Sequence, residues 1–151
     1  MRKWTLIGLA VGVGILLVSQ VVPYGRAHSN PAVTRTVAWD SPATERLARA
    51  ACFDCHSNET VWPWYSNVAP ISWLVQADVQ GGREHLDFSE WDRPQEADPA
   101  EIVESARSGS MPPVQYTLLH RGSRLSTSER AALARGLERT LGADPPIGGG
   151  G

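Results

Sequence analysis

The feature that most constrains this chain is a pair of cysteines followed at once by a histidine. Cys52, Cys55 and His56 stand in the order C-x-x-C-H, and the 151-residue chain has no other cysteine. In this pattern two thiols attach haem c covalently through neighbouring vinyl groups, and the histidine ligates the iron. Because thioether bonds retain the cofactor even in a domain with a thin core, the motif predicts a small fold around one covalent haem per chain.

The same cysteine spacing occurs in three other kinds of site, each of which requires a further feature. A C-x-x-C redox dithiol belongs to a βαβ context, and no strand pattern is visible in the sequence. A structural zinc ion requires four ligands, and only scattered histidines could complete the set. A disulfide between Cys52 and Cys55 would close a very short loop and stabilise little. The motif therefore favours covalent haem, with a haem-free redox dithiol as the alternative.

An iron held by one histidine has a second axial position, for which Met111 is the predicted ligand. It is the only methionine after the initiator and lies in the string Gly-Ser-Met-Pro-Pro at 109–113, where proline restricts the backbone. A thioether sulfur opposite a histidine raises the reduction potential of haem iron. His85 is the alternative ligand and would give a bis-histidine haem, whereas His28 and His120 are interpreted as surface or packing residues.

The first 22 residues have the composition of a membrane segment. Arg2 and Lys3 precede nineteen mostly apolar residues at 4–22, which as a helix would reach about 28 Å, close to the hydrocarbon thickness of a bilayer. The positive-inside rule then predicts a single-pass inner-membrane anchor with the remainder of the chain in the periplasm. A cleaved signal peptide is the alternative, because small residues around Gly25 and Ala27 could be a cleavage site.

The remainder of the chain is predicted to be all-α with long loops. We interpret residues 23–40 as a linker, 41–142 as the haem-binding domain and 143–151 as a disordered tail. Cap and proline signals predict helix starts at Pro42, Pro70, Pro99 and Thr127. Glycines predict the ends of the last three helices, at 81–82, 109 and 142.

Residues 52–141 resemble a family of bacterial haem-binding domains related to class I c-type cytochromes. The similar strings lie at 52–60, 62–65, 68–73, 82–86, 88–91, 109–113 and 116–120. The resemblance implies a cytochrome c-like helical domain with covalent haem on Cys52 and Cys55, His56 as the proximal ligand and Met111 as the distal ligand. It also implies that the helix after Leu125 packs against the helix that carries the motif. It specifies neither a reaction nor a partner.

Charge and context narrow the expected function. The formal net charge is −2, from 14 basic and 16 acidic residues, so no basic surface for nucleic acid is expected. We expect one-electron transfer by a protein that is not an enzyme, with membrane or periplasmic redox proteins as partners and the lipid bilayer as its support. The alternative is a haem-based sensor or ligand-binding module with a labile sixth ligand. Peroxide reduction would need a distal His/Arg pair that the sequence does not identify.

Overall fold

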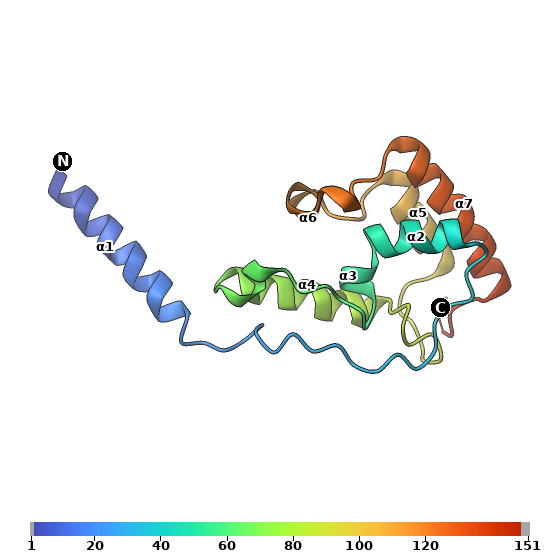
Figure 1. Cartoon of the computed structure of the whole chain (residues 1–151), viewed down its shortest axis with the longest axis horizontal. Helices are drawn as coiled ribbons and strands as arrows, with labels where there is room; N and C mark the ends of the chain where they lie inside the picture. Colours follow the sequence, from blue (N-terminus) through green and yellow to red (C-terminus); the bar gives the residue numbers. More distant parts are fainter. Residues whose placement is uncertain (1, 149–151) are drawn as a thin grey trace. The chain divides into compact units, whose positions relative to one another are not determined.

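The computed structural model describes residues 2–148, and those residues form helices and loops with no strand beyond two isolated bridges (Figure 1). The predicted all-α class is confirmed. The helices are α1 (Arg2–Ser19), α2 (Pro42–Ala51), α3 (Phe53–His56), η1 (Trp64–Asn67), α4 (Ile71–His85), α5 (Pro99–Ser108), α6 (Val114–Leu119), η2 (Arg121–Ser123) and α7 (Thr127–Ala143).

Three helices begin where the local cap signals predict. The side chain of Ser41 accepts from the third backbone N–H of α2, and Asp98 does the same for α5. Ser126 and Glu129 form a reciprocal capping box at the start of α7. Each cap satisfies a backbone donor that the first turn of a helix leaves unpaired, so each start is determined within a few residues of sequence.

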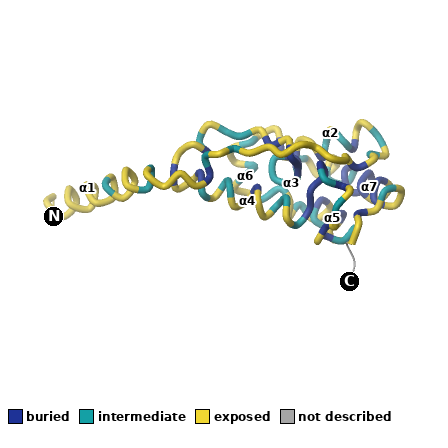
Figure 2. Tube along the Cα trace, turned by 90° about the horizontal axis from the view of Figure 1, so that it is seen from below, coloured by how far each residue is buried: buried dark blue, intermediate teal, exposed yellow. Residues whose placement is uncertain are grey.

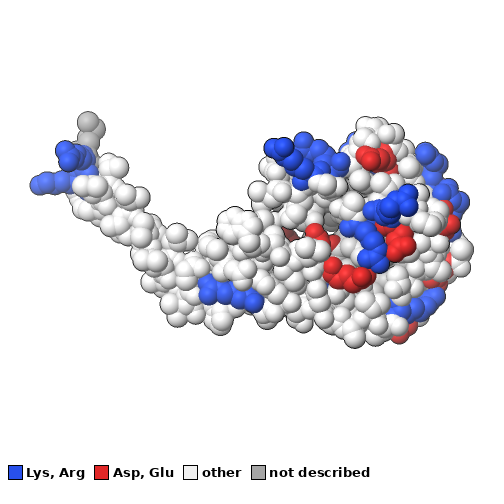
Figure 3. All heavy atoms as spheres, viewed as in Figure 1, with Lys and Arg blue, Asp and Glu red and all other residues white. Residues whose placement is uncertain are grey.

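The chain divides into two compact units, which we describe separately. Unit 1 comprises the chain up to Ser29 together with Trp62–Asp78. Its helix α1 has no buried residue and is long and apolar enough to cross a membrane, although a signal sequence has the same properties. In Figure 3 charged side chains gather at the N-terminal end of α1, and the visible remainder of the helix is uncharged.

Unit 2 comprises Asn30–Val61 and the chain from Val79 onward, and it contains a well-defined core (Figure 2). Helix α7 packs against both α5 and α2. Phe88 stacks between Phe53 at 5.7 Å and Trp91 at 5.9 Å, measured between ring centroids. Leu133 and Leu137 of α7 are almost fully buried in the same core. Because Phe53 belongs to the cysteine motif, the motif is attached directly to the packed interior.

The structure differs from the prediction at three boundaries. Helix α4 continues through Gly81 and Gly82 to His85, so these glycines lie inside a helix rather than at its end. The predicted linker contributes Val37, which is only 3% exposed, to the core of unit 2. Order also extends past residue 142. Asp144 pairs with Arg35 at 2.6 Å, and the carbonyl of Ile147 accepts from Gln95. Residues 149–151 of the predicted tail lie outside the described residues.

Candidate functional site

The cysteine motif occupies the junction between α2 and α3. Cys52 is the C-cap of α2, and its carbonyl accepts from the backbone N–H groups of Cys55 at 3.2 Å and His56 at 2.9 Å. One turn therefore brings together both thiols and the imidazole. The two cysteines are free rather than joined in a disulfide. Burial, with a smaller contribution from Cys55, raises the pKa of Cys52 to about 12, so its thiol is protonated and neutral at ordinary pH.

The imidazole of His56 is held by two backbone carbonyls. Its Nδ1 lies 2.9 Å from the carbonyl oxygen of Gly82 and 3.0 Å from that of Leu86. Carbonyl oxygens only accept hydrogen bonds, so Nδ1 carries the proton and Nε2 keeps its lone pair. Burial also lowers the pKa of His56, which favours the neutral ring. A neutral imidazole with its second nitrogen fixed by a carbonyl is the usual form of a histidine that ligates a metal.

Gly82 allows this arrangement because it has no side chain. A Cβ built at Gly82 would lie 2.4 Å from the carbonyl oxygen of Cys55, whereas one at Gly81 would meet nothing within 4 Å. The backbone of α4 therefore touches the backbone of the motif turn, and this contact brings the Gly82 carbonyl within reach of His56. In the sequence both glycines predict a helix end, and this role of Gly82 cannot be found there, since a glycine pair gives no signal of what it packs against.

Arg83 holds the loop that follows His56. Its Nε donates to the carbonyl of Ser57 at 2.8 Å, and its Nη2 donates to Thr60 Oγ1 at 2.9 Å and to Asn30 Oδ1 at 3.0 Å. The arginine therefore joins α4 to the segment after the motif at two points, Ser57 and Thr60, and also to Asn30, which precedes the motif. Together with the contact at Gly82, these bonds make α4 the support of the motif turn.

Asp87 places an almost fully buried carboxyl one residue after Leu86, at 1% exposure. Its Oδ1 accepts from the backbone N–H of Ser89 at 2.8 Å, and its Oδ2 has no hydrogen-bond partner among the described residues. Burial raises the pKa of Asp87. Burial has this effect because it disfavours the charged form of a carboxyl.

Met111 lies outside the motif turn in the sequence, on the loop between α5 and α6. Gly109 ends α5 in the left-handed conformation with φ of 76°, and the Met111 N–H donates to the carbonyl of Ser105 at 3.3 Å. The Met111 side chain is 43% exposed. The structure thus brings Cys52, Cys55 and His56 together on one turn and places Met111 on a separate, partly exposed loop.

The other histidines have partners of their own. Nδ1 of His85 lies 3.6 Å from Glu96, and its Nε2 lies 3.1 Å from Glu101. His120 stacks on Tyr116 at 4.0 Å, and in unit 1 His28 stacks on Trp62 at 4.8 Å. The predicted packing roles of His28 and His120 agree with these contacts. At His85 both ring nitrogens face carboxylates, which makes it a poorer candidate for an iron ligand than Met111.

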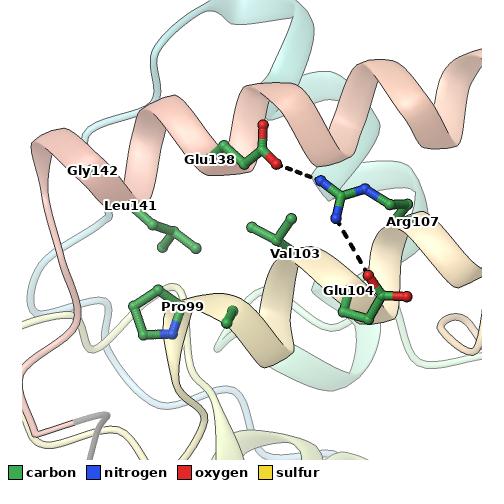
Figure 4. A pocket seen from close by; sticks show the side chains of 8 residues that line it. Pro99, Val103, Glu104, Arg107, Glu138, Leu141 and Gly142 are labelled. Carbon is green, nitrogen blue, oxygen red and sulfur yellow. Dashed lines mark hydrogen bonds and ion pairs between the residues drawn. The ribbon is translucent and has the colours of Figure 1, made fainter.

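A surface hollow between α5 and α7 is not part of the cysteine site (Figure 4). Arg107 crosses it and pairs with Glu104 at 3.3 Å and with Glu138 on the other helix. Its lining residues are Pro99, Ala100, Val103, Glu104, Arg107, Glu138, Leu141 and Gly142. Over residues 2–148, no group of three or more His, Cys, Asp or Glu side chains could hold a bare metal ion.

Comparison with known proteins identifies one family. The family model described as a haem-binding domain matches residues 14–139, a stretch that contains the cysteine motif, α4 and the Met111 loop. No curated protein and no solved structure matches the chain.

Proposed function

The chain belongs to the haem-binding domain family, and from this premise we propose that it is a membrane-anchored protein that carries one covalent haem c and transfers single electrons outside the cytoplasm. The observation that carries the proposal is the state of His56. Two carbonyls hold its Nδ1–H, and Nε2 keeps its lone pair. Cys52 and Cys55, on the same turn, are not joined in a disulfide. This is the donor set that a C-x-x-C-H haem requires.

The residues of the motif turn each have a role in this proposal. Each thiol, of Cys52 and of Cys55, would add across a vinyl group, so that sulfur bonds to one carbon and the proton passes to the other. The addition changes no oxidation state, and it requires reduced cysteines, as the structure has them. His56 Nε2 and the Met111 sulfur would ligate the iron. When bound, the haem supplies the ferric/ferrous couple.

The protein's contribution is to keep the proximal ligand in place while the electron moves. Gly82 and Leu86 orient the His56 ring through their carbonyls, and Arg83 ties α4 to the loop behind the motif. An imidazole whose Nδ1 is held by two carbonyls moves little between oxidation states. Electron transfer benefits from such small rearrangement, because the surrounding dipoles are already oriented.

The proposed location follows from α1. An apolar helix with basic residues at its N-terminal end suits a single-pass inner-membrane anchor with the haem domain in the periplasm. Membrane or periplasmic redox proteins would then be its partners, and the bilayer would confine encounters to the membrane surface. A cleaved signal peptide would give the same compartment without the anchor.

A second candidate function is a haem-based sensor or ligand-binding module. The observation that favours it is the position of Met111, which is 43% exposed on a loop separate from the motif turn. A sixth ligand held in this way could be displaced by a small gas molecule.

The proposal is tested on the full chain made in a host that attaches c-type haem. Intact mass should exceed that of the polypeptide by one haem, with a Soret band, and both should be lost in the Cys52→Ser/Cys55→Ser double variant. The same mass reports whether residues 1–22 are retained. Resistance of the reduced protein to carbon monoxide supports electron transfer, and rapid stoichiometric binding supports the sensor. A polypeptide mass without added haem would overturn both.

A further inference from the structure

Asp54, which lies between the two cysteines, connects the motif turn to two other segments. Its Oδ1 accepts from the backbone N–H of Val61 at 3.0 Å, and its Oδ2 accepts from the hydroxyl of Tyr116. Asp54 therefore binds the loop after the motif with one oxygen and α6 with the other.

Tyr116 is a partly buried residue of α6, a helix whose backbone packs against no helix other than η2 among the described residues. Val114, Leu118 and Leu119 of the same helix are 71%, 64% and 66% exposed. Because these aliphatic side chains bury so little surface, they contribute little to holding α6 in place. The ring of Tyr116 stacks on His120, a neighbour in sequence, so that contact does not connect α6 to the motif turn.

The position of α6 is passed on to Met111 through a short, stiff connection. Pro113 is the N-cap of α6, and Pro112 follows Met111 directly, so both residues between Met111 and the helix have restricted backbones. At its other end the loop is bound to α5 by a hydrogen bond from the Met111 N–H to the carbonyl of Ser105. A shift of α6 therefore moves Met111 rather than being absorbed by a flexible linker.

We propose that Asp54 and Tyr116 are positioning residues, and that the hydroxyl–carboxylate bond between them holds the Met111 loop against the motif turn so that the Met111 sulfur can occupy the sixth position of the haem iron. This inference rests on the proposed function, since it assumes covalent haem with His56 and Met111 as ligands. The inference gives Asp54 a part in selecting the distal ligand.

The test compares Tyr116→Phe with the unchanged full chain carrying haem. The substitution keeps the ring that stacks on His120 and removes only the hydroxyl. We expect unchanged haem content by intact mass, a weaker sulfur-to-iron charge-transfer band in the ferric spectrum, and a reduced form in which the population open to carbon monoxide rises by about tenfold. Tyr24→Phe, the same chemical change in unit 1, is the matched control and should alter none of these.

Two changes at Asp54 separate positioning from general destabilisation. In an Asp54→Ala background, Tyr116→Phe should have no further effect on the band or on carbon monoxide binding, because the two residues act as one pair. Asp54→Asn keeps an oxygen acceptor and should retain more of the band than Asp54→Ala.

Three results would overturn the inference or its premise, and they can be told apart. A Tyr116→Phe protein with the band and carbon monoxide resistance of the unchanged chain overturns the positioning role. Loss of haem or of helicity in both Tyr116→Phe and Asp54→Asn would show that the pair is needed for folding. That result also overturns the positioning role. If the unchanged chain carries haem but lacks the band, the proposed His56/Met111 ligation itself has failed.

Discussion

Gly82 and Cys55 meet backbone to backbone, so closely that a methyl group on Gly82 would begin 2.4 Å from the Cys55 carbonyl oxygen. The contact joins α4 to the motif turn and places the Gly82 carbonyl 2.9 Å from Nδ1 of His56. The proximal ligand of the proposed haem is therefore oriented by a helix whose approach depends on one missing side chain.

The first prediction tests this contact with two adjacent glycines of one helix. Gly82→Ala should destabilise the protein by about 1–3 kcal/mol, because the Cβ would meet backbone atoms that cannot move aside, and it should lower haem incorporation. Gly81→Ala is the matched control. Its Cβ meets nothing within 4 Å, and the better helix propensity of alanine should stabilise by up to about 1 kcal/mol. Denaturant unfolding and haem content check both variants, and equal effects would contradict the role given to Gly82.

The second prediction concerns the sixth ligand. Met111→Ala should abolish the sulfur-to-iron charge-transfer band and lower the reduction potential, since a thioether ligand favours ferrous iron. The side chain is 43% exposed, so the free energy of unfolding should change by less than about 1 kcal/mol apart from the lost iron bond. His85→Ala should leave the spectrum unchanged, because Glu96 and Glu101 engage that ring. A spectrum that responds to His85→Ala and not to Met111→Ala would indicate bis-histidine ligation.

The third prediction is a pH dependence that arises from Asp87. Burial raises its pKa above the ordinary value of 3.8, so between that value and the folded pKa the folded protein binds more protons than the unfolded chain. The free energy of unfolding should therefore fall as pH rises through this window. Asp87→Asn keeps an acceptor for the N–H of Ser89 and should remove the fall, leaving the protein roughly 1 kcal/mol more stable at neutral pH.

The measurement for Asp87 is unfolding by urea at a series of pH values. The exposed Asp92 provides the control, since Asp92→Asn changes the same group without removing a buried charge. If Asp87→Asn and the unchanged protein show parallel pH profiles, the buried carboxyl is not the source of the dependence.

The fourth prediction tests the crossing of α2 and α7. A Cβ on Gly136 would lie 2.1 Å from Oγ1 of the buried Thr44, so Gly136→Ala should cost about 1–3 kcal/mol in thermal or chemical unfolding. Gly142→Ala, on the same helix with open space around it, should be neutral or stabilising. Thr44→Ala removes two of the three obstructing atoms. The double variant should therefore lose less free energy of unfolding than the two single variants lose together. Strict additivity would show that the helices separate instead.

The features that could be predicted from the sequence are those that depend on neighbours along the chain. The starts of α2, α5 and α7 follow from cap residues within three positions of the donors they satisfy. The grouping of Cys52, Cys55 and His56 follows from their spacing on a single turn. Such features are set by local backbone geometry, and no knowledge of the packing is needed to predict them.

The surroundings of that turn, in contrast, depend on contacts that form only when the chain is folded. The two carbonyls at His56, the packing of Gly82 on Cys55 and the bond from Tyr116 to Asp54 all join segments that are distant in sequence. The sequence predicts a helix end at Gly82 because a glycine has the same local signature at a terminus and at a close contact. Periodicity and caps report which face of a helix is apolar, but not which backbone it will touch. Those contacts are selected when the core of unit 2 closes around Phe53, Phe88 and Trp91.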